Sequence, residues 1–219
     1  DVLDMSRIES GKVQLQECQV YLPDILKEST ENMLNIYEPD KAHVRHVSKL
    51  ALTMFDSWKS IHGLRSNYRR LLETAALLHD IGIGINYYSH ARHSAYVIQN
   101  AKLFGLSHKE QFMVSVIAGW HHGHSKNYLR DHFYKKMLTE SNWKVVTKLA
   151  VLLALAESLD FTNSKQIQNI TPDIQKKNAS LTIVSPGIPS IELHELYDHK
   201  SWFKKTMGVE LNIDVKNII

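Results

Sequence analysis

An adjacent His79-Asp80 pair closes an apolar run that ends at Gly82, and further histidines and aspartates lie on both sides of it. His43 precedes the pair, and Asp160 follows the most apolar stretch of the chain. Imidazole nitrogens and carboxylate oxygens are ligands that borderline and hard divalent cations accept. An ion held in this way can polarise a phosphate and activate a water molecule. The residue types therefore predict a metal-dependent phosphohydrolase with the ligands His43, His79, Asp80, His93, His121 and Asp160.

Three basic residues lie near these ligands in the sequence and would favour a phosphate by charge if they face the same cleft. These candidate substrate-binding residues are Arg92, Lys126 and Arg130. Each histidine has an alternative role that is purely structural. A buried His43, for example, could be a hydrogen-bonded core residue. His122 is a weaker candidate, since neighbouring residues at a helix end point in different directions. Five further histidines are interpreted as surface residues or as hydrogen-bond partners of ligands: His46, His90, His108, His124 and His132.

Composition limits the class of protein. The 219 residues are 43% hydrophobic and 22% charged, with a formal charge of +3, which indicates a soluble globular protein with one well-buried domain and a small appendage. Cys18 is the single cysteine, so neither a disulfide framework nor a thiolate metal cage is expected, and a cytoplasmic location follows. The apolar run 149–156 is too short to span a membrane, and no signal peptide is evident. The first residue, Asp1, suggests a fragment, a processed product or an engineered chain.

Helical periodicity dominates from residue 23 to about residue 161 and predicts a mainly α fold, a bundle of helices. Asp40 is a plausible N-cap for the helix that carries His43 on its inward face. Ser107 and Glu110 have the spacing of a capping box. The helix expected at 142–159 is apolar on nearly all sides and should be central, which brings Asp160 to the edge of the core.

Period-two patterns replace the helical period after residue 164. They predict strands at 179–184, 190–195 and 209–215, with a short helix at 200–207 before the last strand. The expected organisation is a leader at 1–22, a helical domain at 23–163 and a small β-β-α-β subdomain at 164–219.

The ordered set His43, His79-Asp80 and Asp160 resembles the ligand set of the HD superfamily of metal-dependent phosphohydrolases. A richer string resembles the C-terminal helical domain of the exopolyphosphatase and guanosine pentaphosphate phosphohydrolase family, from about residue 24 to the end. That string comprises His43–Val47, Leu77–Gly82, His90–Ile98, Leu106–Glu110 and Trp120-His121. In that family the phosphatase site generally lies in N-terminal actin-like domains, with glycine-rich loops and a catalytic glutamate that this chain lacks. The resemblance thus also implies an accessory half that dimerises and holds a polyanion.

The HD resemblance further implies that His93 and His121 hold a second ion or the substrate phosphate, with Asp80 as a bridge, so Asp80, His93 and His121 are the catalytic candidates. One or two divalent ions are expected, drawn from Mn, Fe, Mg and Zn. The favoured function is hydrolysis of polyphosphate or a phosphorylated nucleotide by a homodimer, without a membrane or a specific nucleic-acid site. Residues 1–22 resemble the linker of a sensor histidine kinase, so a signalling output domain is a further alternative.

Overall fold

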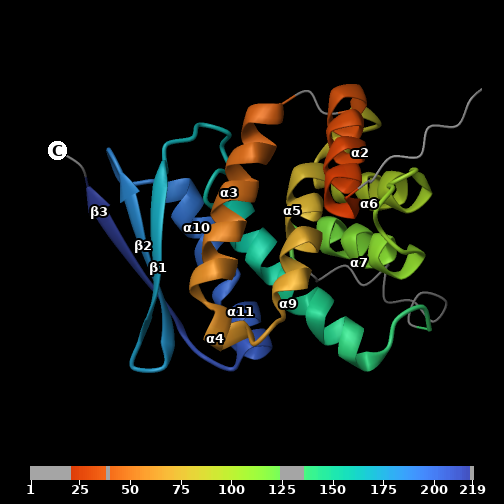
Figure 1. Cartoon of the computed structure of the whole chain (residues 1–219). Helices are drawn as coiled ribbons and strands as arrows, with labels where there is room; N and C mark the ends of the chain where they lie inside the picture. The colour runs from red at the N-terminus through yellow and green to blue at the C-terminus, as the bar shows by residue number, and fades with distance from the viewer. Residues whose placement is uncertain (1–20, 38–39, 124–135, 218–219) are drawn as a thin grey trace, which may run out of the picture.

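The computed structural model describes residues 21–37, 40–123 and 136–217. Most of the predicted kinase-like leader, together with Lys126 and Arg130, lies outside the described residues. The mainly α fold with a small α/β part is confirmed (Figure 1). In chain order the elements are α2 (Leu22–Tyr37), α3 (Lys41–Ser57), α4 (Lys59–His62), η1 (Ser66–Tyr68), α5 (Arg69–Leu78), η2 (Ile81–Gly84), α6 (His90–Asn100), α7 (His108–Gly119), α9 (Glu140–Ser158), β1 (Asn169–Gln175), β2 (Asn178–Ser185), α10 (Ser190–Asp198), α11 (Lys200–Met207) and β3 (Leu211–Asn217).

Both predicted helix caps are present. The Asp40 side chain accepts a hydrogen bond of 2.9 Å from the backbone N–H of His43, which fixes the first turn of α3. Ser107 and Glu110 form the reciprocal capping box at the start of α7. The α3–α4 segment stops at Gly63, whose φ of 62° is the left-handed conformation that favours glycine.

Helix α9 is the central element, as its composition predicts. It contacts α3, α5 and α7 on one side and α10 and α11 on the other. Its apolar residues from Val146 to Ala156 are almost all fully buried, so the helices around it share one core. Within the described part of the chain, none of the helices is long and apolar enough to cross a membrane.

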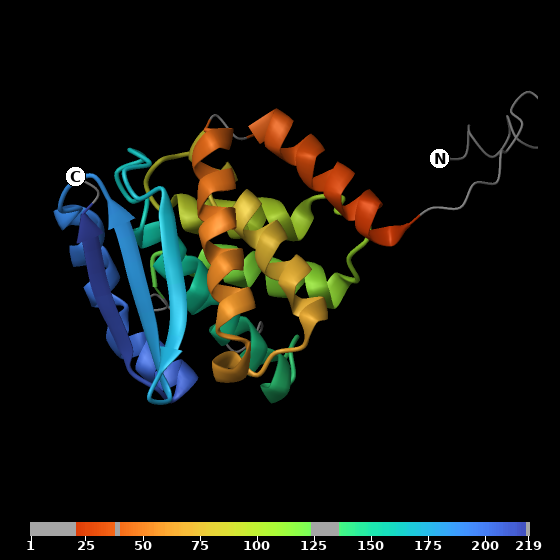
Figure 2. The ribbon, with the colours of Figure 1, turned by 60° about the vertical axis from the view of Figure 1, so that its left-hand side comes forward.

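The three strands form one sheet in the order β1-β2-β3, and Figure 2 shows β1 beside α3. The β1–β2 pair is antiparallel, whereas β2 and β3 are parallel. A parallel pair needs a long crossover connection, which α10 and α11 supply; both helices contact α9, and α11 also contacts β3. The prediction of strands at 179–184 and 209–215 and of a helix at 200–207 is confirmed within about two residues.

The predicted strand at 190–195 is wrong, because these residues begin α10. Glu192 and Leu196 are buried one helical turn apart, while Ile191 is 54% exposed, so the apparent alternation does not mark a buried sheet face. The sequence prediction also missed the first strand, β1, which contains Pro172. Pro172 is tolerated there because β1 is an edge strand.

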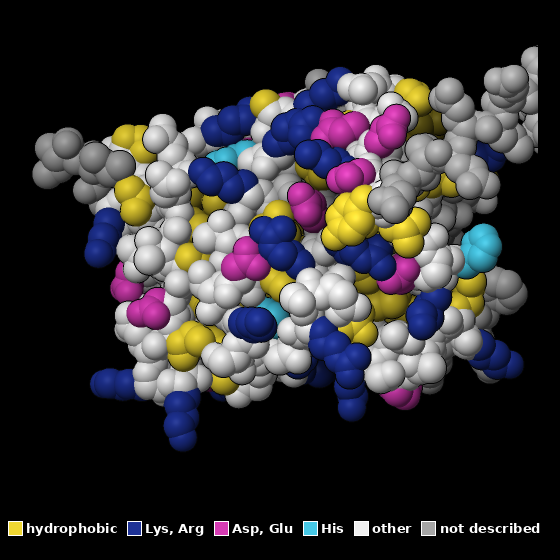
Figure 3. Space-filling view, in the orientation of Figure 1, with side chains coloured by type: hydrophobic (Ala, Val, Ile, Leu, Met, Phe, Trp, Pro, Cys, Tyr) yellow, Lys and Arg dark blue, Asp and Glu magenta, His cyan; other side chains and the backbone are white. Residues whose placement is uncertain are grey.

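The face of the molecule formed by α2, α3 and α5 carries basic and acidic side chains interspersed (Figure 3). Arg45 pairs with Glu31, and Arg69 pairs with Asp56 and Glu73. Because these charges largely compensate one another, this face is not a basic surface for a polyanion.

Candidate metal centre

Polar side chains from five helices meet where the helix ends converge. His43 comes from the first turn of α3, and His90 is the first residue of α6. The other side chains lie in the last turns of α5, α7 and α9 or directly after them: His79, Asp80, His121, His122, Glu157 and Asp160. The bundle therefore gathers residues separated by more than a hundred positions, and most of them are buried.

The inner group consists of His43, His79 and Glu157, all buried. Glu157 Oε2 lies 2.9 Å from His79 Nε2 and 3.2 Å from His43 Nε2. One ligand atom from each residue lies within 4.8 Å of the others, a spacing compatible with one shared ion.

The outer group consists of His90, His121 and His122. His121 is buried, His90 is partly exposed and His122 is exposed. His90 Nε2 lies 3.0 Å from the Nε2 atoms of both other histidines. Three imidazole nitrogens facing one another at this distance form a second candidate position for an ion.

Asp80 lies between the two groups. Its Oδ1 is 3.2 Å from His90 Nε2, 3.5 Å from His121 Nε2 and 3.6 Å from His79 Nε2. Its Oδ2 is 3.7 Å from His43 Nε2. The carboxylate thus reaches both groups, as a bridging ligand must.

Backbone carbonyls fix the orientation of three imidazole rings. The Nδ1 atoms of His79, His121 and His90 lie 2.7, 2.6 and 3.0 Å from the carbonyl oxygens of residues 76, 118 and 87. In the neutral ring, Nδ1–H donates to the carbonyl and the lone pair of Nε2 points toward the centre. This is the tautomer that a metal ligand needs, set by a hydrogen bond behind it.

Asp160 orients His43 in the same way. Its Oδ2 accepts a hydrogen bond of 2.8 Å from His43 Nδ1, and its Oδ1 accepts one of 2.7 Å from the backbone N–H of Lys165. Both oxygens are thereby engaged. Asp160 thus lies behind His43, and the direct ligand role that the sequence predicts for it stays a prediction.

The cluster holds more negative charge than a buried site tolerates without compensation. Burial lowers the pKa of His43, but the carboxylates of Asp160 and Glu157 outweigh it and raise that pKa to about 10. Burial likewise disfavours charged His79, yet Asp80 and Glu157 raise its pKa to about 9. Burial works against charge on Asp80 and Glu157 too, but the neighbouring histidines hold both carboxyl pKa values below their usual range. Two imidazolium charges balance the carboxylates here, and a divalent cation would supply the same charge.

Two buried atoms at the centre indicate that the residues fit an ion. His43 Nε2 and Asp80 Oδ1 have no hydrogen-bond partner of acceptable geometry within the described part of the chain. Orphaned buried polar atoms are rare and costly in native structures. Both atoms are ligand atoms of the kind that a divalent cation accepts.

The structure brings together five of the six predicted ligands, His43, His79, Asp80, His121 and Asp160, but not His93. His93 is half-buried on α6 beside Gly82, and its imidazole makes no hydrogen bond or ion pair with the residues that the structure describes. Arg92 is exposed on the same helix. Lys126 and Arg130 lie outside the described residues, so their role as substrate-binding residues is untested.

The sequence analysis did not include Glu157 in the cluster, and it interpreted His90 as a surface residue or a hydrogen-bond partner of a ligand. Glu157 precedes Asp160 by three residues, the helical spacing that puts two side chains on one face, and this spacing was the available signal. Backbone geometry at the start of α6 decides that His90, and not His93, reaches the cluster. Ser89 has φ 60° at the start of α6, a left-handed conformation that a non-glycine residue rarely adopts.

The fold and this cluster define a helical domain whose polar centre suits a divalent ion. The sequence model of the family described as Ppx/GppA phosphatase, domain III, matches residues 25–196, and the chain belongs to this family.

Two curated relatives carry the name guanosine-5'-triphosphate,3'-diphosphate pyrophosphatase. The protein from Aeromonas hydrophila is 30% identical over 95 residues, covering 43% of this chain and 19% of the relative. The protein from Pseudoalteromonas translucida is 29% identical over 109 residues, covering 47% of this chain and 21% of the relative. The matched region therefore spans about a fifth of the length of these relatives.

Proposed function

We propose that this chain carries a metal-dependent phosphohydrolase site of the HD type, which hydrolyses a phosphate ester or phosphoanhydride of polyphosphate or a nucleotide. The observation that carries the proposal is the position of Asp80 between two groups of histidines. Membership of a phosphatase family and the pyrophosphatase name of the relatives support the same reaction class. The ligand set also has the HD order, with His43 first, then His79-Asp80 and Asp160 last.

In this proposal His43, His79 and Glu157 hold one ion, and His90, His121 and His122 hold a second, with Asp80 shared. His90 takes the place that the sequence assigned to His93. Divalent ions bound here would polarise the phosphate and lower the pKa of water. The predominance of imidazole suits zinc or iron, and the carboxylates extend the choice to manganese.

The protein's own residues supply orientation. Asp160 and the backbone carbonyls behind His79, His90 and His121 hold the rings in place before substrate arrives. Such preorganisation removes the cost of ordering ligands during the reaction. Arg92 remains the candidate phosphate-binding cation within the described residues.

The test is elemental analysis of the purified protein together with hydrolysis of inorganic tripolyphosphate and ATP. We expect one or two equivalents of zinc, iron or manganese in the wild type. Asp80→Asn should lose at least half of the bound metal and at least 100-fold in turnover, because it weakens the shared ligand. His93→Ala is the matched control and should retain both. A wild-type protein that neither contains metal nor takes it up on reconstitution would contradict the proposal.

A second candidate function is an accessory domain that binds polyanion and dimerises without hydrolysis. It is favoured by the match to domain III of a phosphatase family and by the short share of the relatives that the chain covers. It predicts salt-sensitive binding of polyphosphate that Asp80→Asn leaves unchanged, and a dimer in sedimentation analysis. A monomer that ignores polyphosphate at low salt would exclude it. The cytoplasmic location and the signalling alternative remain predictions from the sequence.

A further inference from the structure

The loop that follows α9 carries the carboxylate behind His43. Asp160 lies at its start, and its two oxygens accept hydrogen bonds from His43 Nδ1 and from the backbone N–H of Lys165. The far end of the loop is tied to α3, because His46 Nε2 lies 2.8 Å from the carbonyl oxygen of Ile167. Since the loop folds back onto Asp160 in this way, its conformation sets the position of that carboxylate.

Two residues of this loop have a left-handed backbone. Asn163 has φ 54° and Lys165 has φ 52°. Asparagine tolerates this conformation, whereas lysine seldom adopts it, and such a backbone persists only where its surroundings hold it. Lys165 is also the residue whose N–H reaches Asp160 at 2.7 Å. The hydrogen bond that aligns the carboxylate therefore depends on a strained backbone.

A contact with the small α/β part holds the middle of the loop. Glu192, in the first turn of α10, is 3% exposed, and its Oε1 accepts a hydrogen bond from Thr162 Oγ1. Ser164 Oγ lies 2.9 Å from the same hydroxyl and accepts a hydrogen bond from the backbone N–H of Gln166. Because Thr162 gives its one hydroxyl proton to Glu192, Ser164 donates to Thr162. A chain of hydrogen bonds thus runs from the loop backbone to a buried carboxylate.

We propose that Glu192 is a positioning residue of the candidate metal centre: through Thr162 it holds the loop in the conformation in which Asp160 orients His43. Its effect on an ion rests on the proposed function, whereas its effect on the hydrogen bond between His43 and Asp160 does not. The crossover between β2 and β3 then takes part in the site from behind, and the helical bundle does not arrange its polar centre alone.

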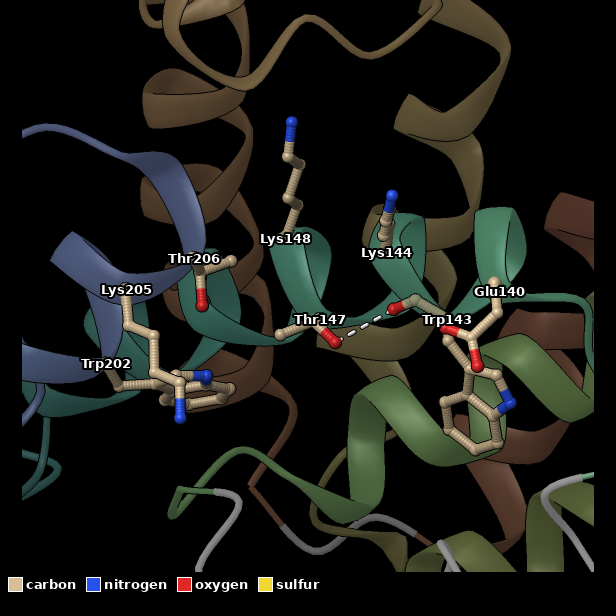
Figure 4. A pocket seen from close by; sticks show the side chains of 8 residues that line it. All are labelled: Glu140, Trp143, Lys144, Thr147, Lys148, Trp202, Lys205 and Thr206. Atoms are coloured by element: carbon tan, nitrogen blue, oxygen red, sulfur yellow. Dashed lines mark hydrogen bonds between the residues drawn. The ribbon is translucent and has the colours of Figure 1, made fainter.

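The crossover also contacts α9 far from the cluster, and this contact supplies a control. There α11 packs beside the first half of α9 around a groove of about 390 Å³, with Trp143 and Trp202 on opposite sides (Figure 4). Thr147 in this groove donates a hydrogen bond of 2.8 Å to the carbonyl oxygen of Trp143. Thr147 precedes Glu157 on α9 by about 15 Å of helix. Removing its hydroxyl tests the loss of such a bond away from the site.

The first measurement is the Kd for Zn²⁺, taken by competition with a chelator. Thr162 is exposed, so Thr162→Val removes the hydroxyl without opening the core. We expect it to weaken Zn²⁺ binding about 10-fold, as partners behind metal ligands typically do. Thr162→Ser keeps the donor and should restore the wild-type Kd. Thr147→Val makes the same change as Thr162→Val in the groove and should leave the Kd unaltered.

A double-variant cycle tests Glu192 itself. Glu192→Ala should weaken Zn²⁺ binding to the same extent as Thr162→Val. The double variant should stay within about 3-fold of either single variant, because both remove one and the same hydrogen bond. If Glu192→Ala does not fold, Thr162→Val and Thr162→Ser decide the question. Losses that add up in the double variant would overturn the proposal.

The second measurement needs no metal. In metal-free protein with nitrogen-15-labelled histidine, the Nδ1–H proton of His43 is identified by NMR as the signal that His43→Gln abolishes. Its exchange with water is slow while Asp160 accepts the proton. We expect exchange about 10-fold faster in Thr162→Val, because the loop then opens more often. Thr162→Ser and Thr147→Val should match the wild type.

A wild-type value for Thr162→Val in either measurement would overturn the proposal. A lower unfolding temperature with the Kd and the exchange rate unchanged is the result that a purely structural contact gives. If the wild type binds no Zn²⁺, the proposed function fails, and the exchange rate alone decides the role of Glu192. Faster exchange in Thr162→Val than in Thr147→Val then supports that role, and equal exchange refutes it.

Discussion

The hydrogen bonds of Asp160 distinguish a residue that binds an ion directly from one that orients a neighbouring ligand. Its carboxylate accepts hydrogen bonds from His43 Nδ1 and from the backbone N–H of Lys165, so in the proposed site it would act on an ion through the imidazole. A carboxylate behind a histidine fixes the tautomer and increases the basicity of the ligand nitrogen.

Asp160→Asn should therefore weaken metal binding without abolishing it. The amide keeps the size of the side chain but removes the charge, and losses behind a ligand are typically about 10- to 100-fold in affinity. Competition with a chelator measures the metal Kd. Asp214→Asn, on an exposed position of β3, is the control with the same chemical change. A variant of Asp160 with no bound metal at all would make this residue a direct ligand.

His62 is a buried histidine outside the cluster, and it shows what a purely structural histidine looks like here. Its Nε2 lies 2.8 Å from the carbonyl oxygen of Phe55, and its Nδ1 accepts a 2.9 Å hydrogen bond from the N–H of Leu64. Both nitrogens are satisfied by backbone, whereas Nε2 of His43 is not. Whether a ring nitrogen lacks a hydrogen-bond partner therefore identifies a candidate ligand better than burial of the side chain does.

Burial lowers the pKa of His62 below 6.5, so the fold favours its neutral form. The stabilisation that this neutral form gives is present above pH 6.5 and is lost as the pH falls below that value, since the unfolded state then takes up a proton more readily. His62→Gln should reduce the fall in unfolding free energy between pH 7 and pH 5. Denaturant unfolding at each pH measures it, with exposed His108→Gln as control. Identical pH profiles for wild type and His62→Gln would contradict this account.

At the scale of elements, the site depends on how closely α6 approaches the end of α5. A Cβ on Gly82 would lie 2.3 Å from the carbonyl oxygen of His90 and 2.4 Å from the N–H nitrogen of Ser94. The N–H of Gly82 also donates to Ser94 Oγ at 2.9 Å. Gly82 therefore permits a backbone contact that places His90 beside Asp80.

Gly82→Ala should push the first turn of α6 away and remove His90 from the outer group. We expect it to lose the outer metal equivalent and at least 10-fold in turnover, and to cost about 1–3 kcal/mol of stability through overpacking. Gly84→Ala is the matched control, because its nearest atom would be an ordinary 3.5 Å away. Elemental analysis and thermal unfolding read out both effects. Full metal content in Gly82→Ala would show that α6 is positioned by other contacts.

The helices and their caps were predictable because local signals specify them. Apolar periodicity, the cap at Asp40 and the capping box at Ser107 act within a few residues. The strands were harder, because the pattern at residues 190–195 fits both periods over so short a run. The parallel pairing of β2 with β3 favours a helix at residues 190–195, because parallel strands need a long crossover connection. This pairing is a long-range feature of the fold.

The sequence predicted the kind of candidate site but only some of the residues that form it. Histidine and aspartate at helix ends indicated a metal, but the ligand at His90 depends on the conformation of Ser89 and the space at Gly82. Glu157 shows its role only once α9 is seen to be central. Such details belong to packing, which a local pattern does not encode.

At the scale of the whole molecule, the helical part and the small sheet share one hydrophobic core. Ile183 and Leu211 of the sheet belong to the same buried cluster as Val47 and Leu149 of the helices. Trp58, at the end of α3, is buried against Phe203 of α11, and its Nε1–H donates to the carbonyl oxygen of Asp173 in β1 at 3.0 Å. The predicted division at residues 163 and 164 thus crosses a continuous core.

Trp58→Phe should destabilise both halves together. It removes the hydrogen bond to β1 and leaves a cavity, which we expect to cost about 2–4 kcal/mol in unfolding free energy. Circular dichroism and near-ultraviolet absorbance should still show a single coincident transition, shifted to lower temperature, with metal content retained because His43 lies at the opposite end of α3. Half-exposed Tyr197→Phe is the control. If the variant instead unfolds in two steps, with the sheet lost before the helices, the two parts fold independently and the sheet does not stabilise the bundle. A single step would make the sheet part of the framework that holds the helices of the candidate metal site.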